Sequence, residues 1–162
     1  MAVIGIDPGT ALTGYGIVEE LPDKSLHLID FGVIRTDSKD KQETRLRIIF
    51  SQLNSILSTY KPENGAVERL YFQRNTRTAI SVGQARGVAI LSLAEAGLSI
   101  SEYDPVEIKQ AVVGYGKASK NQVQQMVKLL LKLEEIPKPD DAADALAVAI
   151  CHIHSQKLKS IQ

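Results

Sequence analysis

The chain has 162 residues, of which 44% are hydrophobic and 23% are charged, and its formal net charge is zero. These values are typical of an ordinary globular protein, and the length suits a single domain, residues 1–162, with its own core. A neutral chain is not expected to coat nucleic acid by charge alone, and no apolar run is long enough to span a membrane. The lone cysteine, Cys151, cannot form an internal disulfide, which favours a cytoplasmic location.

The first predicted element is a short apolar strand that contains Val3, Ile4 and Ile6 and ends at Asp7. Such a run is typical of a strand buried on both faces, and Pro8 with the glycine after it turns the chain. A carboxylate at the end of a buried strand needs a partner, which we expect to be a metal ion or a phosphate. Alternatively, Asp7 caps the turn through its own backbone.

The next elements are a hairpin, a helix and a further strand. Residues 15–19 and 26–34 predict two strands joined by a turn, and apolar residues recur at helical spacing from Leu46 to Tyr60. Residues 66–68 then predict a strand that ends at Glu68. Because a whole helix precedes this strand, it can lie parallel to the first strand and bring Glu68 next to Asp7.

Residues 69–75 predict a loop, and a long helix follows at about 76–96. Aromatic and basic residues alternate in and after the loop, a composition that suits base stacking and phosphate binding. They are Arg69, Tyr71, Phe72, Arg74 and Arg77. The helix carries Gly83 and Gly87 among several alanines, so its small residues suit either a packed core or a dimer interface.

The last part of the chain predicts a strand at 98–103 and three helices. Asp104 and Ser119 begin two of these helices with capping boxes, and the final helix covers residues 140–150. Between Lys109 and Lys132 there are five lysines and no acid: Lys109, Lys117, Lys120, Lys128 and Lys132. This segment forms either a DNA-binding surface or solvated helix faces.

Acidic residues open the final helix. Asp141 and Asp144 share one face at i,i+3, whereas Asp140 is better placed as the N-cap. All three could simply charge the first turn of the helix. Together with Asp7 and Glu68, however, Asp141 and Asp144 predict a site for two Mg²⁺ or Mn²⁺ ions that cleaves phosphodiesters.

Zinc is not expected, because the acidic residues are not accompanied by a Cys/His ligand pattern. The three histidines are interpreted as structural or surface residues: His27, His152 and His154.

Four motifs in register resemble the RuvC family of bacterial Holliday-junction resolvases, from about Val3 to His154. They are Ile4-Gly-Ile-Asp-Pro-Gly9 with Thr13-Gly-Tyr-Gly16, Gly83-Gln-Ala-Arg-Gly-Val-Ala89, Lys109-Gln-Ala-Val-Val-Gly114 and Asp141-Ala-Ala-Asp-Ala-Leu-Ala147. The resemblance implies an α/β, ribonuclease H-like fold, with a five-stranded mixed sheet flanked by helices on both faces. It also implies a homodimer that nicks two strands of like polarity in a four-way DNA junction, leaving 5′-phosphate ends.

The resemblance also implies roles for individual residues. Two Mg²⁺ ions per subunit, which Mn²⁺ can replace, would bind to the catalytic carboxylates of Asp7, Glu68, Asp141 and Asp144. DNA-binding roles are expected for Tyr71, Arg74, Arg77, Lys109, Lys117 and Lys120. The dimer helix would include Gly83, Gly87 and Leu91, and a branch-migration helicase complex of the RuvA and RuvB type would be a partner. Arg69 follows Glu68 where the family often has an acidic or amide residue, which could alter the charge near the metal.

Three other functions compete with this interpretation. An actin-like ATPase also begins with a strand and an Asp-x-Gly-Thr turn, but it needs two lobes to close on ATP. A DNA-structure-binding dimer without activity would keep the basic surface. A nuclease of the same fold could act on another branched substrate or on RNA.

Overall fold

The structure is a computed structural model that describes residues 1–71 and 76–161. At its centre is a five-stranded sheet in the order β3-β2-β1-β4-β5. The strands are β1 (Ala2–Asp7), β2 (Leu12–Glu20), β3 (Leu26–Arg35), β4 (Asn64–Glu68) and β5 (Ser99–Tyr103). The first three pair in antiparallel fashion, whereas β4 lies parallel to β1 and to β5. The mixed sheet predicted from the sequence is therefore confirmed.

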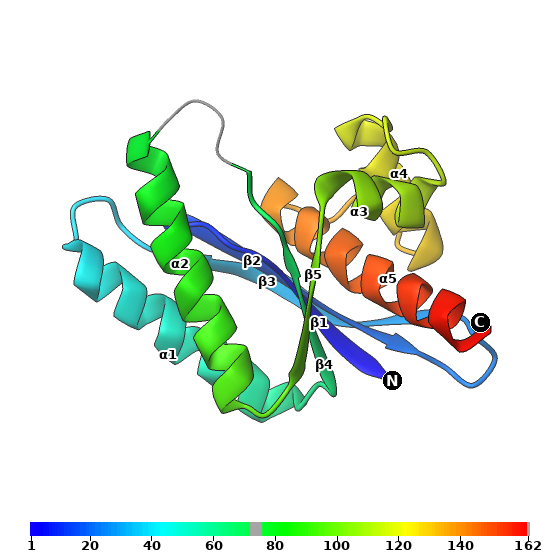
Figure 1. Cartoon of the computed structure of the whole chain (residues 1–162), viewed down its shortest axis with the longest axis horizontal. Coiled ribbons are helices and arrows are strands. Elements are labelled where there is room, and N and C mark those ends of the chain that lie inside the picture. Colours follow the sequence, from blue (N-terminus) through cyan, green and yellow to red (C-terminus); the bar gives the residue numbers. More distant parts are fainter. Residues whose placement is uncertain (72–75, 162) are drawn as a thin grey trace.

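Helices cover both faces of this sheet (Figure 1). On one face lie α1 (Gln42–Tyr60) and α2 (Thr76–Glu95), and on the other lie α3 (Pro105–Val113), α4 (Lys120–Leu130) and α5 (Asp140–Ile161). The final helix continues past residue 150, where the sequence analysis ended it, because its apolar face still meets the core as far as Ile153. No helix in the described part of the chain is both long and apolar enough to cross a membrane.

Alternation along β1 sorts its side chains between two cores. Ile4 and Ile6 belong to the core under α1 and α2, whereas Val3 belongs to the core under α3, α4 and α5. Because side chains alternate along a strand, Gly5 and Asp7 face the same side as Val3. The carboxylate that ends β1 therefore faces α5.

Glycines allow α5 to lie directly on the sheet. A Cβ atom built on Gly5 would clash with the carbonyl oxygen of Ala145 and would lie 2.6 Å from the backbone nitrogen of Ala149. A Cβ atom on Gly16 of β2 would lie 2.6 Å from the Cδ2 atom of Leu146. Only residues without a side chain fit under this helix, so these glycines set the height of α5 above the sheet.

Two capping boxes fix the starts of α3 and α4, as the sequence predicted. The backbone nitrogen of Asp104 donates to Glu107 Oε2 at 2.7 Å, and the backbone nitrogen of Gln122 donates to Ser119 Oγ at 3.2 Å. Each box satisfies amide groups that the helix start would leave unpaired. They determine where the helices that carry Lys109 and Lys120 begin.

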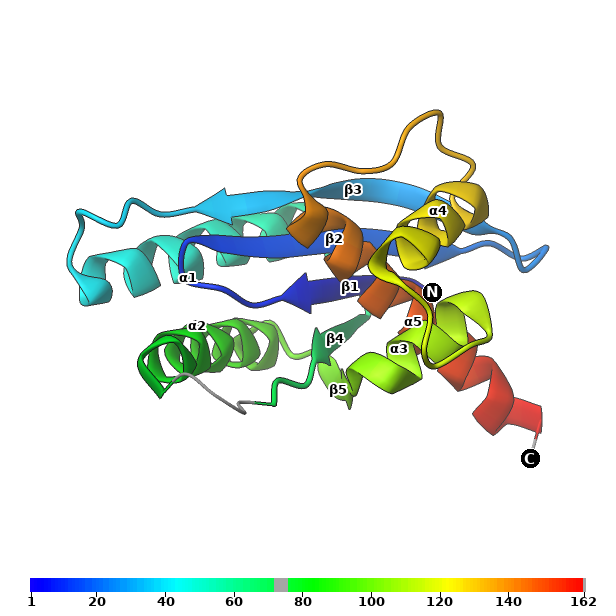
Figure 2. The ribbon, with the colours of Figure 1, turned by 90° about the horizontal axis from the view of Figure 1, so that it is seen from above.

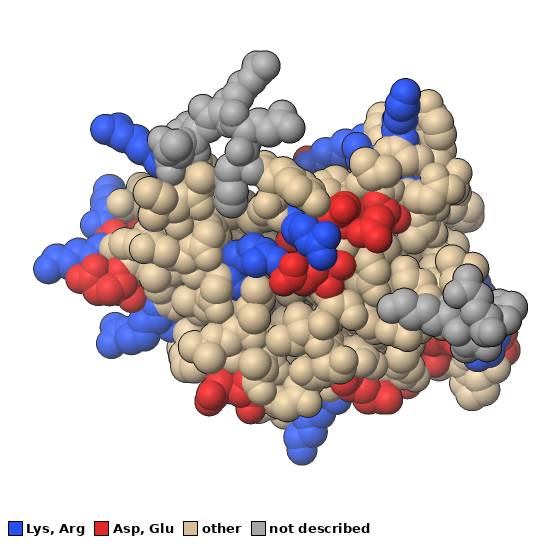
Figure 3. All heavy atoms as spheres, in the orientation of Figure 1, with Lys and Arg blue, Asp and Glu red and all other residues tan. Residues whose placement is uncertain are grey.

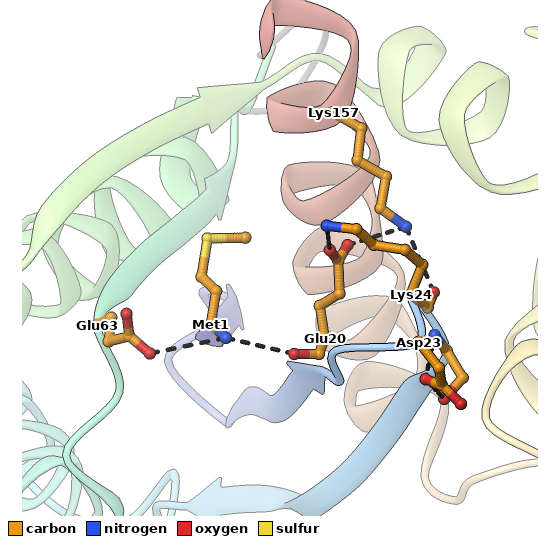
Figure 4. A network of polar contacts seen from close by, with 7 residues as sticks. Met1, Glu20, Asp23, Lys24, Glu63 and Lys157 are labelled. Atoms are coloured by element: carbon orange, nitrogen blue, oxygen red, sulfur yellow. Dashed lines mark hydrogen bonds and ion pairs between the residues drawn. The ribbon is translucent and has the colours of Figure 1, made fainter.

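A polar network ties the start of β1 to the end of β2 and to the last turns of α5 (Figure 4). The Nζ atoms of Lys24 and Lys157 lie 3.0 and 2.8 Å from the carboxylate oxygens of Glu20. The amino terminus of Met1 donates to the carbonyl oxygen of Glu20 at 3.3 Å and lies 3.8 Å from Glu63 Oε1. Burial alone would raise the pKa of Glu20, but the hydrogen bonds from both lysines lower it overall. The network therefore holds the end of the sheet that lies away from Asp7.

We predict that Gly5→Ala lowers the free energy of unfolding by roughly 3 kcal/mol, at the upper end of overpacking costs. The added Cβ atom meets backbone atoms of α5, which cannot rotate away. Urea unfolding followed by circular dichroism would measure the change. Ser51→Ala, on an exposed position of α1, is the control and should stay within about 0.5 kcal/mol of the unmodified chain. Equal stability of the two variants would contradict this account of the helix–sheet contact.

Candidate active site

Two neighbouring parallel strands end in carboxylates on the same side of the sheet. The register pairs Ile6 of β1 with Val67 of β4, and the next residues along the two strands are Asp7 and Glu68. Ala66 belongs to the core under α5, and Val67 belongs to the opposite core, so Glu68 faces α5 by alternation. The predicted approach of Glu68 to Asp7 is thus built into the sheet.

The first turns of α5 carry two further acidic residues, Asp141 and Asp144, and α5 packs on the sheet beside β1 and β2 (Figure 2). Gly14 of β2 pairs with Asp7 across the sheet, and a Cβ atom on Gly14 would clash with the carbonyl oxygen of Asp141. The helix therefore begins directly above the end of β1. Asp144 follows Asp141 at i,i+3 and lies on the same side of the helix.

The charges of these groups act on one another. Burial is the largest cause that raises the pKa of Asp7, and together with the neighbouring carboxylates of Asp144, Glu68 and Asp141 it brings the pKa to about 8. Burial also raises the pKa of Glu68 and of Asp144, each with a contribution from another acid of the cluster. The raised pKa values of Asp7, Glu68 and Asp144 show that free anions are unfavourable here, so the cluster favours a bound cation.

Lysines from α3 and α4 stand beside this cluster. Lys120 Nζ lies 3.3 Å from Asp144 Oδ2, and both Lys120 and Lys109 oppose the rise in the pKa of Glu68. A hollow of about 250 Å³ is lined by Glu68, Lys109, Lys120 and Asp144 together with apolar residues of α3 and α5, and we refer to it as the lysine hollow. The hollow places lysines beside carboxylates. A phosphodiester substrate needs such cations for its phosphate, and a metal ion needs such carboxylates as ligands.

Asp140 does not act as the expected N-cap. The structure makes it the first residue of α5, and its carboxylate lies 3.5 Å from Lys120 Nζ and 3.6 Å from Lys138 Nζ. A hydrogen bond from Gln124 and the charge of Lys120 lower its pKa, in contrast to those of Asp7 and Asp144. The lysines at the helix start supply its partners, so Asp140 stands apart from the carboxylate cluster.

Within residues 1–71 and 76–161, no group of three or more His, Cys, Asp or Glu side chains is arranged to hold a metal ion as it stands. The histidines are structural or surface residues, as the sequence interpretation expected: His27 is exposed, and the other two have partners within the fold. His152 Nδ1 lies 3.0 Å from the Tyr103 hydroxyl, and His154 Nδ1 lies 2.8 Å from the carbonyl oxygen of Ala111. Only carboxylates therefore remain as ligand candidates at the end of β1.

Arg69 turns away from Glu68. Its Nε and Nη1 atoms lie 3.4 Å from Glu102 and 3.2 Å from Asp104, so its charge is directed to β5 and the start of α3. The Tyr71 hydroxyl donates to the same Asp104 carboxylate at 2.8 Å, while the ring remains 62% exposed. Figure 3 shows basic and acidic side chains side by side over this region. The capping box predicted Asp104 only as a cap, and nothing in the sequence indicated that it also holds Tyr71.

The other expected DNA-binding residues are placed unevenly. Arg77 and Lys117 are exposed, on the first turn of α2 and on the connection from α3 to α4. Neither forms an ion pair within the part of the chain that the structure describes. Phe72 and Arg74 lie outside the described residues.

The expected dimer residues lie on one exposed stripe of α2. Gly83 and Gly87 have nothing within 4 Å of a built Cβ atom, and the side chains of Ile80 and Leu91 are 66% and 51% exposed. These positions recur at spacings of three and four residues, so they share a face of the helix. The stripe is therefore apolar and exposed, and it leaves open space above both glycines within the described chain.

Comparisons with known proteins agree on one family. The family model described as crossover junction endodeoxyribonuclease RuvC matches residues 3–152. The RuvC protein of Heliobacterium modesticaldum is 57% identical over 96% of this chain and 95% of its own length. The Thermus thermophilus RuvC structure superposes with a TM-score of 0.90 at 35% identity, covering 98% of this chain and 97% of that one. A second Thermus thermophilus RuvC structure, in complex with a Holliday junction substrate, superposes with a TM-score of 0.89 at 32% identity. The match covers 98% of this chain and 96% of that one.

We predict that Asp7→Asn stabilises the metal-free protein at high pH. The pKa of about 8 in the folded chain lies above the ordinary value of 3.8, so folding becomes less favourable as the pH rises between these values. An amide carries no charge and avoids this cost. The free energy of unfolding should rise by up to roughly 6 kcal/mol at pH 9 and change little at pH 4. Denaturant titrations in EDTA would measure both, and an equal effect at the two pH values would contradict the assigned coupling.

Proposed function

The chain belongs to the RuvC family of crossover junction endodeoxyribonucleases, and from that premise we propose that it resolves four-way DNA junctions in recombination and repair. Residues 1–162, taken as one nuclease domain, would act in the cytoplasm as a homodimer. The dimer would nick two strands of like polarity symmetrically, leaving 5′-phosphate and 3′-hydroxyl ends. The observation that carries this proposal is the meeting of four carboxylates beside the lysine hollow, in a chain of this family.

The proposed ligands of the metal are Asp7, Glu68, Asp141 and Asp144. They fit Mg²⁺, or Mn²⁺ in its place, by donor chemistry, since hard cations take carboxylate oxygens. The raised pKa of Asp7 supports this choice, because burial and acidic neighbours make a free anion unfavourable there. As no ready-made ion site is present among the described residues, binding would draw these side chains toward one another.

Two bound ions would activate a water molecule and stabilise the leaving oxygen of the phosphodiester. The chain itself would hold the substrate. Lys120 and Lys109 line the hollow next to Glu68 and Asp144, where their ammonium groups can bind phosphate oxygens. Lys120 would then exchange its contact with Asp144 for one with the phosphate. These lysines would orient the strand over the carboxylates.

The exposed ring of Tyr71 would stack on a base at the crossover, where pairing is interrupted. Its hydroxyl bond to Asp104 and the position of Arg69 on the same carboxylate support a ring that is already oriented before DNA binds. Arg77 and Lys117 are exposed cations that would contact the backbone, and Arg74 is kept as a third contact from the loop.

The stripe of Ile80, Gly83, Gly87 and Leu91 would form the dimer interface. Its exposed apolar residues and bare glycines support a second copy of α2 packed closely against the first. A two-fold dimer matches the symmetry of an open junction and would place one carboxylate cluster on each of two strands. The RuvA and RuvB type of branch-migration helicase stays the proposed partner, as family membership implies.

The proposed function predicts that Asp7→Asn slows junction cleavage by at least roughly 100-fold while junction binding stays within about threefold. The substitution removes a ligand oxygen but leaves Lys109 and Lys120 in place. Gel-shift and single-turnover assays on the same four-way junction would measure binding and cleavage. Asp23→Asn, in the turn between β2 and β3, is the control. Cleavage by Asp7→Asn at the control rate would remove Asp7 from the active site.

We predict that Lys120→Ala weakens junction binding and lowers the slope of log K against log salt concentration by about one unit. The matched control is Lys61→Ala, an exposed lysine that ends α1, away from the carboxylates. It removes the same charge but should leave the slope unchanged. Fluorescence anisotropy at several salt concentrations gives both slopes. Identical slopes for the two variants would place Lys120 away from phosphate.

We predict that Leu91→Glu raises the dimer dissociation constant by at least roughly tenfold, because it buries a charge in the interface on both copies. Leu129→Glu tests the same chemistry at an exposed leucine on α4, outside the stripe, and should leave the dimer intact. Sedimentation velocity across a concentration series distinguishes them. Dissociation of both variants, or of neither, would count against the α2 interface.

A further inference from the structure

A second hollow, of about 410 Å³, lies on the other side of the carboxylates from the lysine hollow. Its lining residues come from the turn between β1 and β2 and from the N-terminal parts of α1, α2 and α5. We refer to it as the Arg45 hollow, because Arg45 is the one cation among the lining residues that the structure describes. It shares Asp141 with the carboxylate cluster, but the function proposed above gives no role to Arg45.

Hydrogen bonds hold the walls of the Arg45 hollow together. Thr10, which is 7% exposed, has its Oγ1 atom 2.6 Å from Ser81 Oγ and 3.0 Å from the carbonyl oxygen of Ser81. Thr36 Oγ1 donates to the carbonyl oxygen of Thr10 at 2.6 Å. These contacts link the turn after Asp7 to α2 and to the end of β3, so the shape of the hollow is fixed by the fold.

The guanidinium of Arg45 is hydrogen-bonded to this network through its Nε atom. Its Nε atom donates to Thr36 Oγ1 at 2.8 Å, which orients the group. In the ranges 1–71 and 76–161, no carboxylate lies within ion-pair distance of Arg45. A half-buried cation whose terminal nitrogens have no acidic partner favours an anion that the protein itself does not supply.

The Arg45 hollow also borders the active site. Asp141 lines it, whereas Asp144, one turn further along α5, lines the lysine hollow. Two hollows with basic side chains thus flank one set of carboxylates. A DNA strand carries a phosphate at every nucleotide, so a strand whose scissile phosphate lies at the carboxylates extends to both sides of them.

We propose that the Arg45 hollow binds a backbone phosphate of the cleaved strand, near the scissile phosphate and on the side opposite to the lysine hollow. Arg45 would donate its terminal N–H groups to the phosphate oxygens. Thr78, exposed in the first turn of α2, adds a hydroxyl donor, and that turn contains no acidic residue. Asp141 repels an anion, so the phosphate lies on the Arg45 side or beside a cation held by Asp141.

This inference rests on the proposed function, and its test separates the two. The experiment measures binding and cleavage of synthetic junctions by the full chain. In each junction one phosphate is replaced by an uncharged methylphosphonate, at positions over several nucleotides on each side of the nick. Arg45→Gln removes the charge but keeps an amide that can donate to Thr36 Oγ1. Arg47→Ala is the control, because Arg47 is exposed on the same helix and lines a different hollow.

For the unmodified chain, a methylphosphonate at one position on one side of the nick should reduce binding or cleavage roughly tenfold. This factor is about the strength of a charged hydrogen bond. Arg45→Gln should bind or cleave the normal junction roughly tenfold less well, and the methylphosphonate at the sensitive position should cause no further reduction. Arg47→Ala should remain as sensitive to that methylphosphonate as the unmodified chain. Arg45→Lys, which keeps the charge, should recover part of the loss. Thermal unfolding of each variant checks the fold.

The proposal would be overturned if the effects of Arg45→Gln and of the methylphosphonate on binding or cleavage multiply at every position, because the two changes would then act independently. So would an Arg45→Gln variant that equals Arg47→Ala in every assay. If Arg45→Gln does not fold, the same methylphosphonate scan is carried out with Thr78→Ala. The proposal then requires that this variant be less sensitive than the unmodified chain to the methylphosphonate at one position. An unmodified chain that cleaves no junction would refute the function itself rather than the assignment of Arg45.

Discussion

The contact on which the site depends is that of α5 with the bare backbone of β1 and β2. Gly5, Gly14 and Gly16 leave no side chain between helix and sheet, so the helix starts directly above the end of β1. That contact sets Asp141 and Asp144 beside Asp7 and Glu68, which the parallel pairing of β1 and β4 has already joined. Small residues in these strands are therefore a condition of the chemistry as well as of the packing.

The carboxylates that this packing brings together oppose folding when no cation is bound. Burial and mutual repulsion raise the pKa of Asp7 to about 8, and Lys120 compensates only part of the charge at Asp144. A cluster that is unfavourable by itself but suited to cations and phosphates is typical of functional sites, where stability is reduced in favour of activity. The opposite end of the sheet shows the contrast, since ion pairs with Lys24 and Lys157 lower the pKa of Glu20 there.

Local patterns in the sequence were sufficient for much of this structure. A short apolar strand, a hairpin, a helical stripe and a crossover predict the antiparallel and parallel pairing around the first strand, and the two capping boxes place the helices of Lys109 and Lys120. Contacts between distant segments have no such local signal. The ion pair between Asp140 and Lys120 depends on the packing of α4 beside α5, and the bond between Tyr71 and Asp104 depends on the position of the end of β4 beside the start of α3. Arg45 belongs to no motif, and only the fold reveals that it faces the same site as Asp141.

The central claim is that the carboxylate cluster cleaves DNA at a four-way junction with a metal ion. The most direct test maps the nicks on an immobile synthetic junction and on a linear duplex of the same sequence, with Mg²⁺ and with EDTA. Paired nicks at symmetric positions in two strands of like polarity, only on the junction and only with Mg²⁺, are the predicted result. Equal cutting of the duplex, or unchanged cutting in EDTA, would contradict the account.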